Sequence, residues 1–229
     1  MNWGKWVIYR NPLLHMRFET DLPFKIFFSA KSGRQMVESL GLKPIAHLKQ
    51  VHSAIIYRVD NELDAELEGD GLISNSPDLY LAVKVADCYP VFLLDPVNKA
   101  FGVVHAGWRG SYKGIVKLAV QKMDSEFGTK PENLFVVIGP GICGSCYEVS
   151  HDVAAKFDFG VVQKDGHIYL DLNAFNIHEL NEIGVPRPNI LDSPFCTYER
   201  EDLFWSYRRH GQRKRSMWAV IGLKTNKGR

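Results

Sequence analysis

The chain has 229 residues, of which 45% are apolar and 24% are charged, a balance typical of a folded protein with a sizeable core. Its net charge of +2 gives no strong field for attracting nucleic acid or an anionic membrane, so we expect neither as a partner. The sequence contains no stretch near the ~18 apolar residues of a membrane span, and no apolar secretion signal at its start. Four cysteines are too few for a disulfide scaffold of this size, which predicts a cytoplasmic protein.

Short apolar runs separated by turn residues predict the strands, in chain order, at 7–9, 25–28, 51–59, 79–85, 91–94, 101–105, 134–138, around 190, and 217–223. Apolar residues at helical spacing predict helices at 32–40, 111–127, 152–157 and 172–183. We expect the runs at 79–85, 91–94 and 101–105 to be buried strands of one sheet. Because strands and helices do not alternate strictly, the order favours a layered α+β fold over a doubly wound sheet.

Basic residues are concentrated near the C-terminus. They are Arg208, Arg209, Arg213, Lys214 and Arg215, followed in the tail by Lys224, Lys227 and Arg229. These basic residues could form a solvent-exposed surface with a frayed C-terminal end, or they could bind anions. The sequence leaves both interpretations open.

Two histidines and one cysteine lie where predicted strands begin or end. His52 begins one strand, Cys88 follows a second, and His105 ends a third. Side chains at strand ends are supported by a rigid sheet and can converge on one point. Two imidazole nitrogens and a thiolate suit zinc, and three protein ligands leave a fourth position open, as in catalytic zinc sites.

The spacing of these residues alone leaves other interpretations open. They are far apart in the sequence, so each histidine could be a hydrogen-bonded structural residue and Cys88 a small buried apolar side chain. The local sequence favours a site. Asp87 and Asp95 lie near the cysteine, and Gly107 and Gly110 flank a Trp-Arg pair in a turn where small residues let the backbone approach a ligand.

Several sequence blocks around these residues carry a family resemblance. In chain order they are residues 50–52 (Gln-Val-His), 68–73 (Glu-Gly-Asp-Gly-Leu-Ile), 86–91 (Ala-Asp-Cys-Tyr-Pro-Val), 105–110 (His-Ala-Gly-Trp-Arg-Gly), 138–140 (Ile-Gly-Pro), 147–149 (Tyr-Glu-Val), 196–197 (Cys-Thr) and 204–209 (Phe-Trp-Ser-Tyr-Arg-Arg). Together they resemble the signature blocks of the YfiH-like family, also called the laccase-domain, polyphenol-oxidase or purine nucleoside phosphorylase family.

The resemblance implies one domain over residues 1–229, with mixed sheets in the layered α/β/β/α arrangement shared with the cytotoxic necrotizing factor catalytic domain. It implies a metal site on His52, Cys88 and His105, with zinc as the metal and copper as a substitute. Members of the family are described as cleaving adenosine, inosine and methylthioadenosine with phosphate, and as deaminating adenosine. The partners would be a small nucleoside and phosphate, and the resemblance also suggests a homodimer.

Two regions depart from the family pattern. The family opens with a Thr-Arg-x-Gly-Gly segment and a later Asn-Leu-Gly, whereas here the N-terminal segment is shortened to residues 27–33, so no substrate contact carries over from that loop. Near the C-terminus the family often has Thr-Gly-Arg, and only Arg215 matches this motif.

Phosphorolysis requires a bound phosphate and stabilisation of the positive charge that grows on the ribose. Arg109 is the first candidate to hold phosphate as a bidentate clamp, and Arg208 is the second. Trp108 and Tyr207 are candidates to stack on a purine, although packing in the core explains such aromatic residues equally well.

Deamination requires water activated by the metal, together with a group that moves a proton. Asp87 and Asp70 are the candidates for this group, and Asp70 is also a candidate for substrate binding. Each aspartate could instead cap a turn. With Cys88 and Arg109, Asp87 completes the expected catalytic set.

Two other functions fit the same residues. In a cysteine hydrolase, such as an enzyme that edits peptidoglycan precursors, Cys88 would be the nucleophile and His105 its base. The chain could also bind metal without catalysis. A multicopper oxidase is not expected, because such enzymes use many histidines in His-x-His pairs, and this chain has 8 histidines and no such pair.

Two further motifs lie in residues 139–146. Gly-Pro-Gly-Ile-Cys-Gly matches G-x-G-x-x-G formally, but Pro140 removes a backbone donor and no apolar helix follows directly, which argues against a dinucleotide site. Cys143 and Cys146 could form a redox pair or half of a zinc knuckle. Because the sequence offers no second pair and Cys196 is isolated in it, we expect a turn with two incidental thiols.

Overall fold

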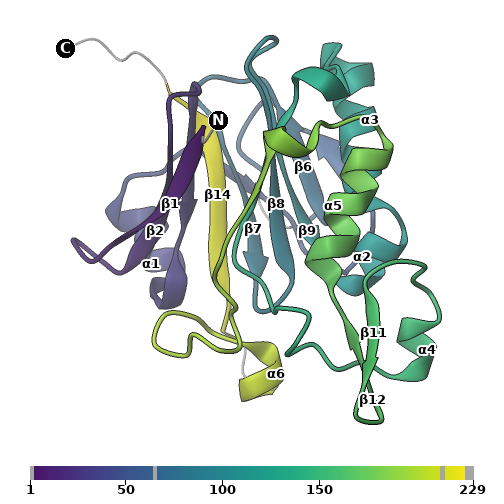
Figure 1. Cartoon of the computed structure of the whole chain (residues 1–229). Helices are drawn as coiled ribbons and strands as arrows, with labels where there is room; N and C mark the ends of the chain where they lie inside the picture. Colours follow the sequence, from purple (N-terminus) through teal and green to yellow (C-terminus); the bar gives the residue numbers. More distant parts are fainter. Residues whose placement is uncertain (1–2, 64–65, 212–214, 225–229) are drawn as a thin grey trace.

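Two six-stranded sheets lie face to face, and helices cover the outer face of each (Figure 1). This computed structural model describes residues 3–63, 66–211 and 215–224. Arg213, Lys214, Lys227 and Arg229 of the basic C-terminal stretch lie outside the described residues. None of the helices in the described ranges is long and apolar enough to cross a membrane.

The first sheet has the order β1-β2-β3-β14-β7-β4. Its strands are β1 (Gly4–Tyr9), β2 (His15–Thr20), β3 (Phe24–Phe28), β14 (Met217–Leu223), β7 (Tyr80–Val85) and β4 (Ile45–His47). All neighbours are antiparallel except β4 and β7, which are parallel. The first sheet therefore joins both ends of the chain to its middle.

The second sheet has the order β13-β10-β8-β9-β6-β5. Its strands are β13 (Ile190–Asp192), β10 (Phe135–Ile138), β8 (Tyr89–Asp95), β9 (Ala100–Ala106), β6 (Gly71–Ser74) and β5 (Ile56–Arg58). The pairs β10–β13 and β5–β6 are parallel, and the others are antiparallel. Both sheets are thus mixed, as the family resemblance implies.

The helices form the two outer layers. On the first sheet lies α1 (Arg34–Ser39), and on the second lie α2 (Trp108–Tyr112), α3 (Ile115–Phe127) and α5 (Leu172–Glu182) (Figure 1). Smaller elements are α4 (His151–Ala154), α6 (Tyr207–His210), the hairpin β11 (Val161–Lys164) and β12 (His167–Leu170), and the 3-10 turns Ala30–Ser32, Pro131–Asn133 and Arg187–Asn189. The α/β/β/α layering of the predicted α+β fold is confirmed.

Alternation along the strands explains why the predicted runs are so apolar. In β14, Met217 and Ala219 face the core between the sheets, whereas Trp218 and Val220 pack in the layer of α1. A strand covered on both faces needs apolar residues at successive positions and not only at every second one. The same holds for β8 and β9, all of whose residues are buried.

The prediction that residues 79–85, 91–94 and 101–105 share one sheet is wrong. β8 and β9 pair in the second sheet, but β7 pairs with β14 and β4 in the first. The chain crosses between the sheets after β7, at Asp87, whose φ is 86°. Runs that are buried on both faces look alike in the sequence, so the pattern does not indicate which sheet each strand joins.

Other boundaries also differ from the prediction. The expected helix 111–127 is divided into α2 and α3 by Gly114, whose φ is 76°. The expected helix 32–40 begins after Gly33 rather than at Ser32. β2 is missing from the prediction, although Met16 and Phe18 alternate there with charged residues. The predictions for β14, α5 and β10 are confirmed to within one residue.

Candidate metal centre and its cavity

Three side chains from distant parts of the sequence meet beside the crossover between the sheets. His52 lies in the loop before β5, Cys88 lies just before β8, and His105 lies near the end of β9. Each offers one ligand atom, and these atoms all lie within 4.8 Å of one another. The centroids of the two imidazole rings are 4.8 Å apart. We call these three residues the His-Cys-His cluster.

His52 does not begin a strand, which corrects the predicted strand 51–59. Only Ile56–Arg58 forms β5, and His52 has a left-handed φ of 57°. The backbone N–H groups of Val51, His52 and Ser53 donate to the carboxylate of Asp70 at 2.6–3.2 Å instead of to a neighbouring strand. The buried carboxylate therefore shapes the loop that presents His52.

The same carboxylate orients His105. Asp70 is fully buried, and its Oδ1 lies 2.8 Å from Nδ1 of His105, while Ser53 Oγ donates to Oδ2 at 2.8 Å. Burial raises the pKa of Asp70, but the hydrogen bonds from His105 and Ser53 outweigh it and lower the pKa to about 2. Because Nδ1 is bonded to Asp70, Nε2 of His105 is the nitrogen available to the cluster.

Cys88 and His105 each shift the pKa of the other towards its charged form. Burial raises the pKa of the Cys88 thiol, but the charge of His105 and hydrogen bonds from both histidines lower it to about 6. Burial lowers the pKa of His105, but the charge of Cys88 and the bond to Asp70 raise it to about 9. The cluster therefore favours a thiolate at neutral pH, the form in which cysteine binds metal.

Gly107 allows the close approach of these side chains. A Cβ atom at this position would lie 2.8 Å from Sγ of Cys88 and 3.1 Å from Cδ2 of His52. Because no real Cβ makes the shorter contact, any larger residue would displace the thiol. The glycine in the turn before α2 is therefore needed by the cluster and not by the turn itself.

Asp87 connects the cluster to the C-terminal part of the chain. Its carboxylate accepts hydrogen bonds from Thr197 Oγ1 at 2.7 Å, from Ser206 Oγ at 3.0 Å and from the backbone N–H of Arg208 at 2.7 Å. The side chain is 7% exposed. Asp87 therefore holds the segments around Thr197 and Arg208 against the loop that carries Cys88.

A cavity of about 1070 Å³ opens beside the cluster. Its wall includes the aromatic residues Trp108, Tyr147 and Tyr207 and the cationic residues Lys49, Lys84, Arg109, Arg208 and Arg215. The guanidinium of Arg109 lies 4.3 Å from the ring centroid of Trp108. Asp87 also lines the cavity, whereas Asp70 lies behind the ligands with its carboxylate directed to protein donors.

Tyr147 and Lys84 line the cavity, but the sequence patterns assign neither of them a role. Burial raises the pKa of Tyr147 to about 12, so its hydroxyl stays protonated at neutral pH. Burial lowers the pKa of Lys84, and Gln50 bonds both backbone groups of this lysine at 2.7 Å. A signal for Lys84 exists in the sequence, because it is the one charged residue in the apolar run 79–85.

Comparison with known proteins agrees with the fold and with the sequence blocks. The model of the family described as multi-copper polyphenol oxidoreductase laccase matches residues 29–224. A protein of Deinococcus radiodurans named purine nucleoside phosphorylase is 36% identical over an alignment of 206 residues, which covers 87% of this chain and 79% of that protein.

Two solved structures share the architecture. The crystal structure of YlmD from Geobacillus stearothermophilus has a TM-score of 0.87 and 25% identity, and the match covers 96% of this chain and 100% of that one. The crystal structure of the Bacillus licheniformis hypothetical protein YfiH has a TM-score of 0.81 and 28% identity, and the match covers 88% of this chain and 93% of that one. With the family match over residues 29–224, these similarities establish that the chain belongs to the laccase-domain, or YfiH-like, family that its sequence blocks resemble.

Proposed function

We propose that the chain is a zinc-dependent purine nucleoside phosphorylase that also deaminates adenosine and works in the cytoplasm. The observation that carries the proposal is the meeting of two imidazoles and a thiolate beside a cavity lined by aromatic and cationic side chains. The name of the Deinococcus relative supports the same class of enzyme.

The donor set fits zinc. His52 and His105 offer nitrogen atoms, Cys88 offers sulfur in its thiolate form, and the three atoms are within 4.8 Å of one another. Zinc is bound at about 2.0–2.3 Å by such ligands, and three protein ligands are typical of a catalytic site. Zinc bound there would supply a Lewis acid at the wall of the cavity. Copper is the alternative metal for the same ligands.

The cationic residues of the wall suit phosphate. In phosphorolysis an oxygen of phosphate forms a bond to the anomeric carbon of the ribose while the bond to the purine nitrogen breaks. The purine leaves with that electron pair and takes up a proton. Arg109 and Arg208 hold phosphate for this attack in our proposal, and Arg215 adds a third charge at the same wall.

The aromatic residues suit the purine. Tyr207 is 59% exposed and Trp108 is partly buried, and both line the cavity, so their ring surfaces can contact a planar base. We assign Asp70 and Asp87 to positioning and not to proton transfer. Each carboxylate already accepts at least three hydrogen bonds from protein donors.

The decisive experiment measures zinc content by elemental analysis and nucleoside cleavage in an assay with inosine and phosphate. We expect wild type to release hypoxanthine only when phosphate is present, and to release ammonia from adenosine. Cys88→Ala should stay folded, lose one zinc ion per chain and lose this activity. His151→Ala changes an exposed histidine of α4 and serves as the matched control. Phosphate-independent cleavage, or an unchanged zinc content in Cys88→Ala, would contradict the proposal.

One observation favours a second candidate. Cys88, His105 and Asp70 form the chain of thiol, imidazole and carboxylate that a cysteine hydrolase uses, and the pKa of Cys88 is lowered to about 6. Removal of zinc separates the two candidates. A chelator should abolish nucleoside cleavage, whereas a cysteine hydrolase would keep its activity without metal and lose it to iodoacetamide.

A further inference from the structure

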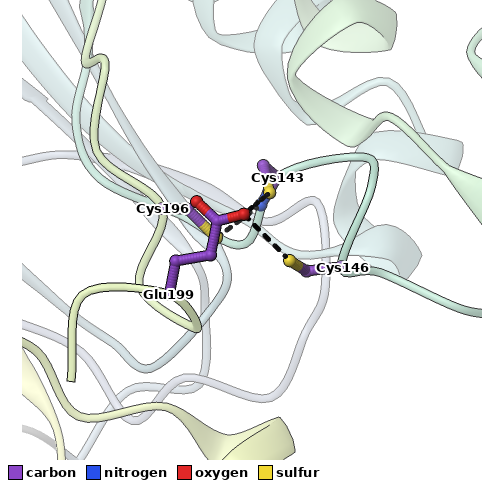
Figure 2. Close-up of side chains that lie close together, drawn as sticks. All are labelled: Cys143, Cys146, Cys196 and Glu199. Carbon is purple, nitrogen blue, oxygen red and sulfur yellow. Dashed lines mark hydrogen bonds between the residues drawn. The ribbon is translucent and has the colours of Figure 1, made fainter.

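The fold brings together a second set of side chains that can bind metal (Figure 2). None of them is among the residues that line the cavity. The members of this set, which we call the three-cysteine cluster, are Cys143, Cys146, Cys196 and Glu199. Their ligand atoms all lie within 4.8 Å of one another. The expectation that Cys143 and Cys146 form a turn with incidental thiols sets Cys196 aside because it is isolated in the sequence, but Cys196 is adjacent to both in space.

The geometry points to a second zinc ion, bound by the three-cysteine cluster, that is structural and not catalytic. This proposal does not depend on the proposed function, because it concerns different residues and a different measurement. The three sulfurs and one carboxylate oxygen fill four positions, which is the closed coordination typical of structural zinc.

The distances agree with one shared ion. With zinc–sulfur and zinc–oxygen bonds of about 2.3 Å and 2.0 Å, a tetrahedral site separates sulfur from oxygen by about 3.5 Å. Oε1 of Glu199 lies 3.5 Å from Sγ of Cys146 and 3.8 Å from Sγ of Cys143 (Figure 2). A sulfur pair would be about 3.8 Å apart around the same ion, so the sulfurs need to approach by at most ~1 Å.

Hydrogen bonds from backbone N–H groups also hold these cysteines close together. The N–H of Cys146 donates to the carbonyl of Cys143 at 3.0 Å, which closes the Cys-x-x-Cys turn. The N–H of Cys143 donates to Sγ of Cys196 at 3.3 Å, an interaction that stabilises a thiolate. Binding would replace the three thiol protons with zinc–sulfur bonds and release those protons to the solvent.

The position of the three-cysteine cluster explains what the ion would do. Cys146 precedes Tyr147, which lines the cavity, and Cys196 precedes Thr197, which donates to Asp87. Gly141 and Cys196 also form an isolated β-bridge, so the two loops already lie side by side. A zinc ion would therefore fasten together two loops that reach the wall of the cavity, without having a position open for substrate.

Metal counts on single and double variants test the proposal. We expect two zinc ions per chain in wild type after dialysis, one in Cys88→Ala, one in Cys146→Ser, and none when both changes are combined. Glu199→Gln should weaken retention of the second ion. Glu201→Gln, two residues further along and also exposed, should leave two ions bound.

Cobalt in place of zinc distinguishes the two sites by their absorption spectra. Folded Cys88→Ala protein loaded with cobalt should keep the intense charge-transfer bands of three thiolates, and Cys146→Ser should keep only the weaker band of one. If Cys146→Ser does not fold, the spectrum of Cys88→Ala decides the question by itself. Folded Cys88→Ala without bound metal would overturn the proposal, as would a Cys143–Cys146 disulfide in protein purified anaerobically.

Discussion

The His-Cys-His cluster and the three-cysteine cluster offer similar candidate ligands in different surroundings. The first offers three ligand atoms, with a buried carboxylate behind one of them and a cavity in front. The second offers four ligand atoms, one of them from an exposed glutamate, and it lies between two loops. The number of ligands and the access to a cavity, more than the chemistry of the ligands, separate a site suited to a reaction from one suited to holding loops.

Removal of one cysteine from each cluster should give the largest difference between the two. We expect Cys88→Ala to lower kcat/KM for inosine by at least ~100-fold, because the metal and its position at the reacting bond are lost together. Cys146→Ser should lower it by less than ~10-fold, since only the support of the wall is weakened. Steady-state assays at saturating phosphate measure both. Equal losses would mean that the two clusters do not differ in role.

Asp70→Asn tests the carboxylate that only the first cluster has. An amide cannot accept all the hydrogen bonds that reach Asp70 and would place a donor against backbone N–H groups. We expect zinc affinity at the His-Cys-His cluster to fall by roughly 10- to 100-fold, measured by competition with a chelator.

Asp87→Asn is the matched control for that change, because Asp87 is also buried but its carboxylate does not bond to a ligand residue. It should leave zinc affinity nearly unchanged and raise KM for phosphate by loosening the segment of Arg208. If both variants lost zinc equally, Asp70 would have no special role in holding the ligands.

How far the sequence predicts each region depends on the range of the contacts involved. The apolar runs of β10 and β14 and the helix α5 are local patterns, and the sequence predicts them. The sheet that β7 joins depends on pairing with β14, more than 130 residues away, and local pattern contains no such information.

The same limit applies to the two clusters. The family resemblance identifies all three residues of the His-Cys-His cluster, but the loop of His52 is shaped by backbone N–H groups bonded to Asp70, which no residue pattern reveals. In the three-cysteine cluster, the Cys-x-x-Cys turn is visible in the sequence, whereas Cys196 reaches it from 53 residues away. Sequence reasoning therefore finds half of the second cluster and does not place Cys196 and Glu199 beside it.

The buried carboxylate of the first cluster should make the stability of the protein depend on pH. The folded pKa of Asp70, about 2, is below its ordinary value of 3.8, so the folded state binds this proton less readily than the unfolded state. The carboxylate thus contributes roughly 2 kcal/mol to the stability of the metal-free protein above about pH 5. The contribution falls as pH decreases from about 5 to 2.

Urea unfolding of metal-free protein between pH 7 and pH 3 measures this contribution. Wild type should lose more stability over the range than Asp70→Asn, since asparagine does not titrate. Glu62, which is exposed and belongs to neither cluster, supplies the control: Glu62→Gln should follow the wild-type curve. Parallel curves for wild type and Asp70→Asn would show that the buried carboxylate has an ordinary pKa in the folded protein.

The smallest expected effect concerns the aromatic wall, which only the first cluster faces. Tyr207 is 59% exposed and lines the cavity, so a purine that stacks on it would gain about 0.5–1.5 kcal/mol. Tyr207→Ala should therefore raise KM for inosine by roughly 2- to 12-fold with little change in kcat. Tyr112→Ala removes a tyrosine that is 50% exposed on α2 and packs on Phe157, and it should leave KM unchanged. A KM that rises equally in both variants would point to a general loosening of the fold, whereas a fall in kcat alone for Tyr207→Ala would place this ring at the reacting bond instead of at the base.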